Sequence, residues 1–155
     1  MGINHHEWMQ QALILAREAE KLGEVPIGAV LIKGGEIIGR GMNRTITDCD
    51  PTAHAEMVAL RNAAASIGNH RLVDTQMYVT VEPCTMCAGA LIHARVAILV
   101  FGATEPKAGA IVSSARVLDN KSLNHHIDVV ANMCREECSE LMTEFFRKKR
   151  EAREK

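Results

Sequence analysis

The sequence predicts an α/β domain in which a mixed five-stranded sheet lies between helices, as a three-layer α/β/α sandwich. A length of 155 residues fits one domain, taken as residues 1–155. Over residues 77–101 a strand, a helix and a strand follow one another, which predicts parallel strands joined by a right-handed crossover. Closer to the N-terminus, two apolar runs flank Lys33-Gly34-Gly35-Glu36, which predicts an antiparallel hairpin. The sheet is therefore expected to be mixed.

The first third of the chain predicts one helix and the hairpin. Apolar residues recur at helical spacing over Asn4–Leu22. Asn4 can cap this helix, Glu7 stands at the capping-box position, and Gly23 is the expected stop. Apolar and β-branched runs then predict strands over Val25–Ile32 and Ile37–Met42.

The central part predicts alternating helices and strands. Asp50-Pro51-Thr52 joins a capping side chain to a proline, whose missing N–H costs nothing at a helix start. Gly102 is expected to close the last strand of this part. The expected elements are a helix from Asp50 to about Ser66, a strand over Met77–Val81, a helix from Cys84 to about Ala94, and a strand over Val96–Phe101.

The last third carries weaker signals before a strong final helix. Residues 103–124 contain proline and glycine and are expected to form a loop, with weak structure over Ile111–Leu118. Val129 is expected in a short edge strand. An amphipathic pattern predicts a helix from Met133 to about Arg150.

Composition narrows the function classes. With 47% hydrophobic and 24% charged residues, a soluble globular protein is expected. No membrane helix and no signal peptide are expected, because apolar runs are short and the first residues lack the secretory pattern. A net charge of −1 and 3% aromatic residues argue against a bulk nucleic-acid binder or a base-stacking sheet. Five cysteines, an odd number, favour reduced cytosolic thiols and metal binding over disulfides.

Cys84 and Cys87 resemble half of a metal site, because residues three apart in the first turn of a helix share a face. The helix N-terminus also favours the thiolate that a metal needs. Several residues are candidates for the other half: Cys134 with Cys138, His54, His70, His93, and the pairs His5-His6 and His125-His126. The pattern of the C-terminal helix favours core positions for Cys134 and Cys138.

His54 stands out because it is expected in the first turn of the other central helix. Helix N-termini meet at the carboxyl ends of the strands in a doubly wound sheet, so His54 can approach both cysteines. Three ligands leave a fourth position open, which is typical of catalytic zinc. Glu56 lies about 200° from His54 around a regular helix, which excludes it as a fourth ligand there but allows it to lean over a metal-bound water.

His54-Ala55-Glu56, followed by Pro83-Cys84-Thr85-Met86-Cys87, matches the signature of zinc-dependent nucleobase deaminases. The resemblance extends over nearly the whole chain. The sequence is similar to the family of bacterial tRNA-specific adenosine deaminases, within the cytidine/deoxycytidylate deaminase superfamily, in Asn43-Arg44, "DPTAHAEMVALR" (50–61), "YVTVEPCTMCAGALIHAR" (78–95), "VFGA" (100–103) and "FFRKKR" (145–150).

This resemblance implies a cytidine-deaminase-like fold and a cytoplasmic homodimer with one Zn²⁺ per subunit. It implies conversion of adenosine to inosine at the wobble position of a tRNA anticodon stem-loop. By matched position, His54, Cys84 and Cys87 are the expected zinc ligands and Glu56 the proton shuttle. Asn43 is expected to hydrogen-bond the flipped base, and the backbone near Ala55 and Pro83 to line its pocket.

The RNA backbone requires cations, and the resemblance points to Lys107, Arg147, Lys148 and Arg150. A solvated helix with i,i+4 ion pairs is the plain alternative for the last three. Two other functions share the motif. One is deamination of a free nucleobase or nucleoside such as guanine or cytosine. The other is a non-catalytic, zinc-stabilised RNA-binding module with a closed four-ligand site.

Overall fold

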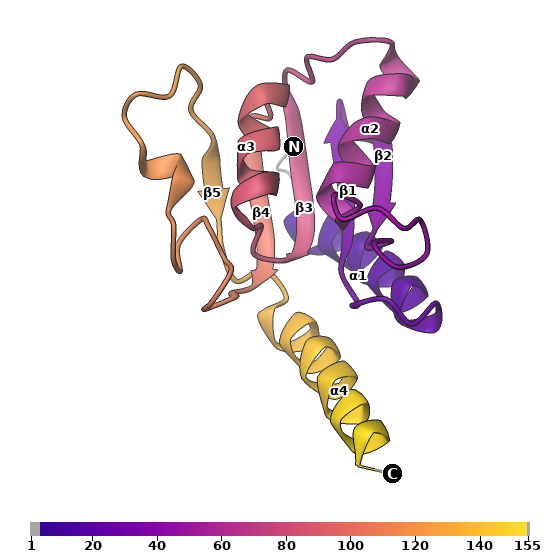
Figure 1. Cartoon of the computed structure of the whole chain (residues 1–155). Helices are drawn as coiled ribbons and strands as arrows, with labels where there is room; N and C mark the ends of the chain where they lie inside the picture. Colours follow the sequence, from indigo (N-terminus) through magenta and orange to yellow (C-terminus); the bar gives the residue numbers. More distant parts are fainter. Residues whose placement is uncertain (1–3, 155) are drawn as a thin grey trace.

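The computed structural model describes residues 4–154, and its elements follow the predicted order (Figure 1). The elements are α1 (His5–Lys21), β1 (Gly28–Lys33), β2 (Glu36–Met42), α2 (Ala55–Ile67), β3 (Thr75–Val81), α3 (Thr85–Ala94), β4 (Ile98–Ala103), the 3₁₀ turn η1 (Val117–Asp119), β5 (Asp128–Val130) and α4 (Arg135–Arg153). None of the helices within residues 4–154 has both the length and the apolar composition that crossing a bilayer requires.

The five strands form one mixed sheet in the order β2-β1-β3-β4-β5. Strand β1 is antiparallel to both β2 and β3, whereas β4 is parallel to both β3 and β5. The predicted hairpin and the predicted parallel pair are both confirmed. Gly34 and Gly35 have φ of +59° and +76°, so the hairpin turn uses the left-handed backbone that glycine adopts without strain.

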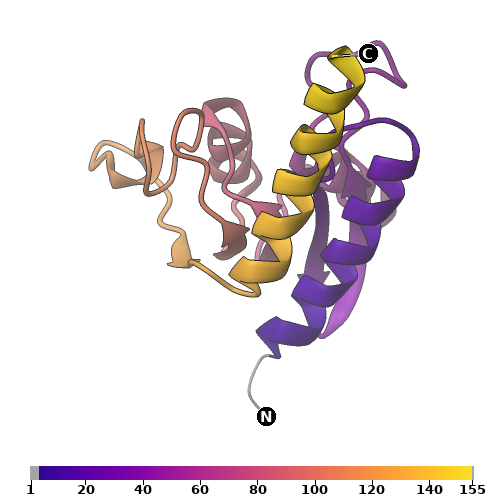
Figure 2. The same ribbon diagram turned by 90° about the horizontal axis from the view of Figure 1, so that it is seen from below.

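Helices cover both faces of the sheet, which confirms the three-layer prediction (Figures 1 and 2). One apolar core lies between the sheet and α2 with α3, and a second lies between the sheet and α1 with α4. Figure 1 shows α2 and α3 beginning at the same end of the sheet, and α4 projecting beyond that end. Figure 2 shows α1 and α4 side by side.

Helix α2 lies very close to β2 because β2 contributes glycines at the contact. A Cβ atom on Gly41 would collide with the carbonyl oxygen of Ala55, and one on Gly39 would collide with that of Ala59. Ala55 is the first residue of α2. The glycines of β2 therefore fix the position at which α2 begins.

The first helix confirms Asn4 as its cap and Gly23 as its stop. Asn4 Oδ1 accepts a hydrogen bond from the Glu7 amide at 3.1 Å, and Gly23 follows the helix with φ of +79°. The next strand begins at Gly28, and the prediction that it starts at Val25 is wrong. Pro26 has no N–H to give to a sheet, and the amide of Ile27 bonds the carbonyl of Val25 at 2.8 Å instead.

The predicted start of the second helix at Asp50 is also wrong, because α2 begins at Ala55. Asp50 Oδ1 accepts hydrogen bonds from the amide and the hydroxyl of Thr52, at 2.8 and 2.7 Å. Asp50-Pro51-Thr52 is therefore a local turn closed by the aspartate side chain. The Asp50 side chain does accept a local backbone amide, but that amide belongs to this turn and not to α2.

Boundaries of three other elements, β3, β4 and α4, shift by a few residues. Strand β3 begins at Thr75, and α4 begins at Arg135 and extends to Arg153. Strand β4 includes Gly102, which was expected to end it. A Cβ atom at Gly102 would collide with Cys138 of α4, so this glycine allows close packing of α4 rather than a strand end.

Candidate metal centre and catalytic site

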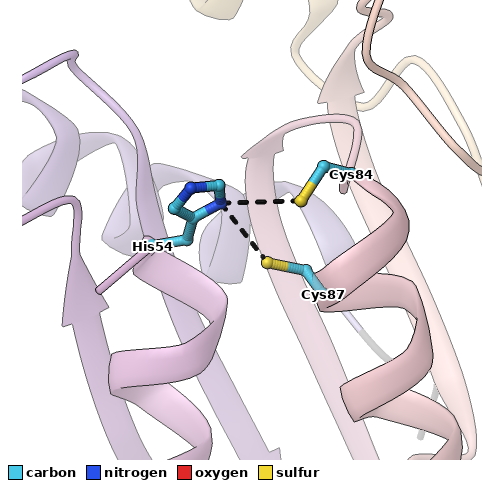
Figure 3. A group of neighbouring side chains, drawn as sticks. All are labelled: His54, Cys84 and Cys87. Carbon is cyan, nitrogen blue, oxygen red and sulfur yellow. Dashed lines mark hydrogen bonds between the residues drawn. The ribbon is translucent and has the colours of Figure 1, made fainter. Parts of the chain in front are cut away.

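His54, Cys84 and Cys87 meet at the starts of α2 and α3 (Figure 3). Nδ1 of His54 lies 3.6 Å from Sγ of Cys84 and 3.6 Å from Sγ of Cys87. The three donor atoms all lie within 4.8 Å of one another. The structure therefore brings together the three side chains that the sequence singled out.

The position of His54 differs from the prediction in a useful way. His54 is the N-cap of α2 rather than a residue of its first turn, with extended backbone angles of φ −73° and ψ 154°. Cys84 is likewise the extended N-cap of α3. An N-cap side chain usually accepts a hydrogen bond from its own helix, yet neither residue does so. Both side chains are thereby free to turn toward each other.

Hydrogen bonds among the two thiols and the imidazole shift the pKa of all three groups. Hydrogen bonds from Cys87 and His54 lower the pKa of Cys84 to about 3, which favours the thiolate form. Cys87 is buried and donates to that thiolate, which raises its own pKa. The hydrogen bond with Cys84 also raises the pKa of His54. The cluster thus favours a thiolate where a cation would bind.

Glu56 lies beside this group, on the first turn of α2, and is only 4% exposed. Burial raises the pKa of its carboxyl group to about 7, although hydrogen bonds with its own backbone amide and with Cys87 oppose the rise. Because His54 is a cap, the 200° separation expected on a regular helix does not apply. Glu56 reaches the cluster without belonging to the three donors.

The donor set fits zinc. One imidazole nitrogen and two sulfurs are ligands that Zn²⁺ prefers. Within residues 4–154, no fourth histidine, cysteine, aspartate or glutamate joins the group. Cys134 and Cys138 belong to the start of α4, on the other face of the sheet, so the closed four-cysteine alternative is not formed. Such a three-donor arrangement leaves a coordination position open.

The chain was compared with known proteins. The profile of the MafB19-like deaminases matches residues 3–150. The chain belongs to this family. The tRNA-specific adenosine deaminase of Haemophilus influenzae is 51% identical over 144 residues, which cover 92% of this chain and 83% of that protein. The resemblance drawn from the sequence is thereby confirmed.

Two solved structures refine the likeness. A structure from a study of A-to-I editing by tRNA:A34 deaminases at the wobble position of transfer RNA is 43% identical, with a TM-score of 0.85. The match covers 87% of this chain and 98% of the chain in that structure. Guanine deaminase from Bacillus subtilis is 41% identical with a TM-score of 0.64, but the match covers only 66% of each chain. The predicted cytidine-deaminase-like fold is confirmed.

Sequence reasoning missed a buried carboxylate that organises one loop of this deaminase. Glu82 is 4% exposed and accepts hydrogen bonds from the backbone amides of Glu105, Ile111, Val112 and Ser113 at 2.8–3.0 Å. The adjacent Pro83 carbonyl accepts from Ala110 at 2.8 Å. Burial raises the pKa of Glu82, but the hydrogen bonds outweigh it and leave the pKa lowered. Glu82 therefore ties the loop over 104–114 to the segment that carries Cys84.

A second buried carboxylate, also missed, organises the loop that leads to His54. Glu24 is fully buried and accepts from the amides of Ile46 and Thr47, at 3.3 and 2.6 Å, and from the Thr47 hydroxyl. These bonds outweigh burial and lower its pKa. The only sequence signal was a glutamate close to a proline, in "EVP" and "EPC", and such a signal does not reveal distant amide partners.

Three other residues were predicted to contact the substrate: Asn43, Ala55 and Pro83. Ala55 directly follows His54 in the sequence, and Pro83 directly precedes Cys84. Asn43 follows β2 and is 7% exposed. Ala55 is fully buried as the first residue of α2, and Pro83 precedes Cys84. The Pro83 carbonyl is already bonded by Ala110, so any contact through it shares that oxygen.

The predicted RNA-binding cations differ from one another. Arg147 pairs with Glu144 at 2.7 Å and with Glu151 at 2.6 Å, and the second of these is one of the i,i+4 pairs of the solvated-helix alternative. Lys148 and Arg150 form no ion pair within the described part of the chain, and Lys107 is exposed on the loop over 104–114. Arg150 and Phe146 line a cavity of about 340 Å³ between α4 and the ends of β3 and β4.

Proposed function

We propose that this protein hydrolyses adenosine to inosine at the wobble position of a tRNA anticodon. The observation that carries the proposal is the open His54–Cys84–Cys87 centre beside buried Glu56, in a chain 51% identical to a named tRNA-specific adenosine deaminase. Residues 1–155 would form one catalytic domain. Each subunit would hold one Zn²⁺ through these three side chains.

The metal and the glutamate would have separate roles. A bound zinc ion lowers the pKa of a coordinated water and so supplies a nucleophile at neutral pH. The Glu56 carboxylate would take a proton from the attacking water and give it to N1 of adenine. After oxygen bonds to C6, Glu56 would pass the second proton to the amino group, and the C6–N6 bond would break to release ammonia. The products are inosine and ammonia.

The pocket residues would position the base. Asn43 is buried just after β2 and would hydrogen-bond the purine through its side-chain amide. The backbone at Ala55 and Pro83 would form the walls. Glu24 and Glu82 would keep the two neighbouring loops in place, because each carboxylate satisfies several loop amides.

The RNA would be held outside the pocket. A stacked base cannot reach such a centre, so a loop nucleotide that can flip out is the suitable substrate. Lys107, Lys148 and Arg150 are exposed and would contact phosphates, while Arg147 must first exchange its glutamate partners. Phe146, 42% exposed beside Arg150, offers a surface for stacking.

The remaining expectations concern assembly and location. Helix α3 carries the partly exposed small residues Gly89 and Ala90, which would allow close approach of a second copy. We propose a homodimer through this helix. We also propose a cytoplasmic location, since tRNA would be the substrate.

Free nucleobase deamination is the second candidate, favoured by the likeness to guanine deaminase. The decisive experiment incubates the zinc-loaded protein with an anticodon stem-loop that bears adenosine at the wobble position. Parallel reactions contain free adenosine, free guanine and free cytosine, and a stem-loop with guanosine at that position. Inosine in the first reaction alone supports the proposal. Deamination of a free base, with the adenosine stem-loop unchanged, would refute it.

A further inference from the structure

A second group of metal-ligand side chains lies on the opposite face of the sheet from the catalytic centre. It consists of His6 on α1, Cys134 as the N-cap of α4, and Glu137 in the first turn of α4. One donor atom from each lies within 4.8 Å of the other two. The deamination described above uses none of these residues.

The group is already held together by a neighbouring amide. Gln10 Nε2 donates to Glu137 Oε1 at 3.0 Å and contacts Cys134 Sγ at 3.6 Å. His6 and Gln10 are four residues apart on α1, so they share one face of that helix. The other oxygen of Glu137, Oε2, lies 3.7 Å from the guanidinium of Arg17.

The arrangement repeats that of the catalytic centre. There, a cysteine at a helix N-cap, a second donor three residues later and a histidine from the start of another helix make a three-donor set. Cys134 is likewise a helix N-cap, Glu137 follows it by three residues, and His6 lies at the start of another helix. The two sites differ in exposure: Cys87 is fully buried, whereas His6 and Glu137 are exposed.

We propose that His6, Cys134 and Glu137 form a second divalent-cation site that takes Zn²⁺. Nitrogen, sulfur and carboxylate oxygen are all established zinc donors, and a thiolate with a carboxylate balances the charge of the ion. A surface hollow of about 380 Å³, lined by these three residues with Asn132, Arg135 and Glu136, gives the ion and its waters access. The bound ion joins the start of α1 to the start of α4.

This site has a structural consequence. Helix α4 projects beyond the sheet (Figure 1), its first turn contains Glu137, and it carries Lys148 and Arg150 farther along. A cation held by one residue of α1 and two of α4 braces that turn. A ligand that binds the folded chain but not the unfolded chain also raises the stability of the folded state.

The test counts zinc in the full chain. Protein is equilibrated with Zn²⁺, freed of excess ion, and analysed for metal per chain. We expect two equivalents for the native protein and one for His6→Ala or Cys134→Ser. Cys49→Ser removes an exposed cysteine elsewhere and should keep both equivalents. His6 is exposed, so His6→Ala removes a donor without opening the core, and circular dichroism verifies folding.

A second readout assigns the lost ion to this site. With Co²⁺ in place of Zn²⁺, Cys134→Ser should lose part of the thiolate-to-metal absorption, while the absorption from Cys84 and Cys87 remains. The native protein should also unfold at a higher temperature with the second equivalent, and His6→Ala should not. A native stoichiometry of one, or an unchanged count in both variants, overturns the proposal. Neither result bears on deamination, because inosine formation is assayed independently of the second equivalent.

Discussion

Nδ1 of His54 and Sγ of Cys84 lie 3.6 Å apart, and both residues are the N-caps of separate helices. Each cap uses its carbonyl to begin its helix, since Val58 bonds to His54 and Ala88 bonds to Cys84. Neither uses its side chain to cap. The ends of two helices thus provide both a rigid frame and uncommitted donors.

The first prediction concerns His54. His54→Ala should lose bound zinc and deaminase activity together, because the two remaining sulfurs come from one turn of α3 and provide only two donors. Metal analysis and inosine formation are measured on the same preparation. His93→Ala, an exposed histidine on α3, is the matched control and should retain both. Full zinc occupancy in His54→Ala would exclude His54 as a ligand.

The second prediction separates proton transfer from metal binding. Glu56→Gln keeps the size of the side chain but cannot accept a proton, so turnover should fall by about 10²–10⁴-fold or more. Zinc content should not change, because Glu56 is not one of the three donors. Single-turnover rates and metal analysis measure the two effects. A variant that turns over at the native rate contradicts the assigned role.

The third prediction concerns Glu82 and pH. Hydrogen bonds hold its folded-state pKa below the unfolded value of about 4.3. Its carboxylate therefore contributes stability that is fully present above about pH 4.3 and is lost as the pH falls through the lower folded value. Glu82→Gln should be destabilised at pH 7, by about 1–3 kcal/mol, because loop amides lose a charged acceptor.

The measurement for Glu82 is urea unfolding at several pH values. The difference between native protein and Glu82→Gln should shrink as the pH is lowered toward 3. Glu18→Gln, on the exposed side of α1, should unfold like the native protein throughout. A difference that grows in acid would mean that Glu82 is protonated in the folded state.

The fourth prediction tests how β2 positions the start of α2. Gly41→Ala places a methyl group against the carbonyl of Ala55, so α2 must shift or the strand must bend. Overpacking of this kind costs about 1–3 kcal/mol. Because His54 precedes Ala55, zinc affinity should fall as well. Unfolding and zinc competition with a chelator measure the two losses, and unchanged values for both would refute the proposed coupling.

The fifth prediction ranks the cations of α4. Arg150→Ala should weaken binding of an anticodon stem-loop and lower the slope of log affinity against log salt by about 0.7–0.9, as expected for one phosphate contact. Arg147→Ala should change the slope less, because Glu144 and Glu151 already occupy its guanidinium. Fluorescence anisotropy at several salt concentrations gives both slopes. A larger effect from Arg147→Ala reverses the ranking.

The choice of His54, Cys84, Cys87 and Glu56 needed no coordinates. Their spacing and the start signals of helices are local, and short segments of sequence carry them. The three-layer architecture could also be predicted from the sequence, because two parallel strands joined by a helix almost always have a right-handed crossover. Three of these residues were therefore expected to meet before the sheet was known.

Tertiary structure decided what local signals cannot encode. The cap positions of His54 and Cys84, the role of Gly102 under α4, and the loop amides around Glu24 and Glu82 all depend on partners that are distant in sequence. Cys134 was expected among core thiols, yet it lies half-exposed beside His6 of α1. Hydrogen bonds and close contacts between separate segments exist only after the chain has packed, so composition and periodicity carry no record of them.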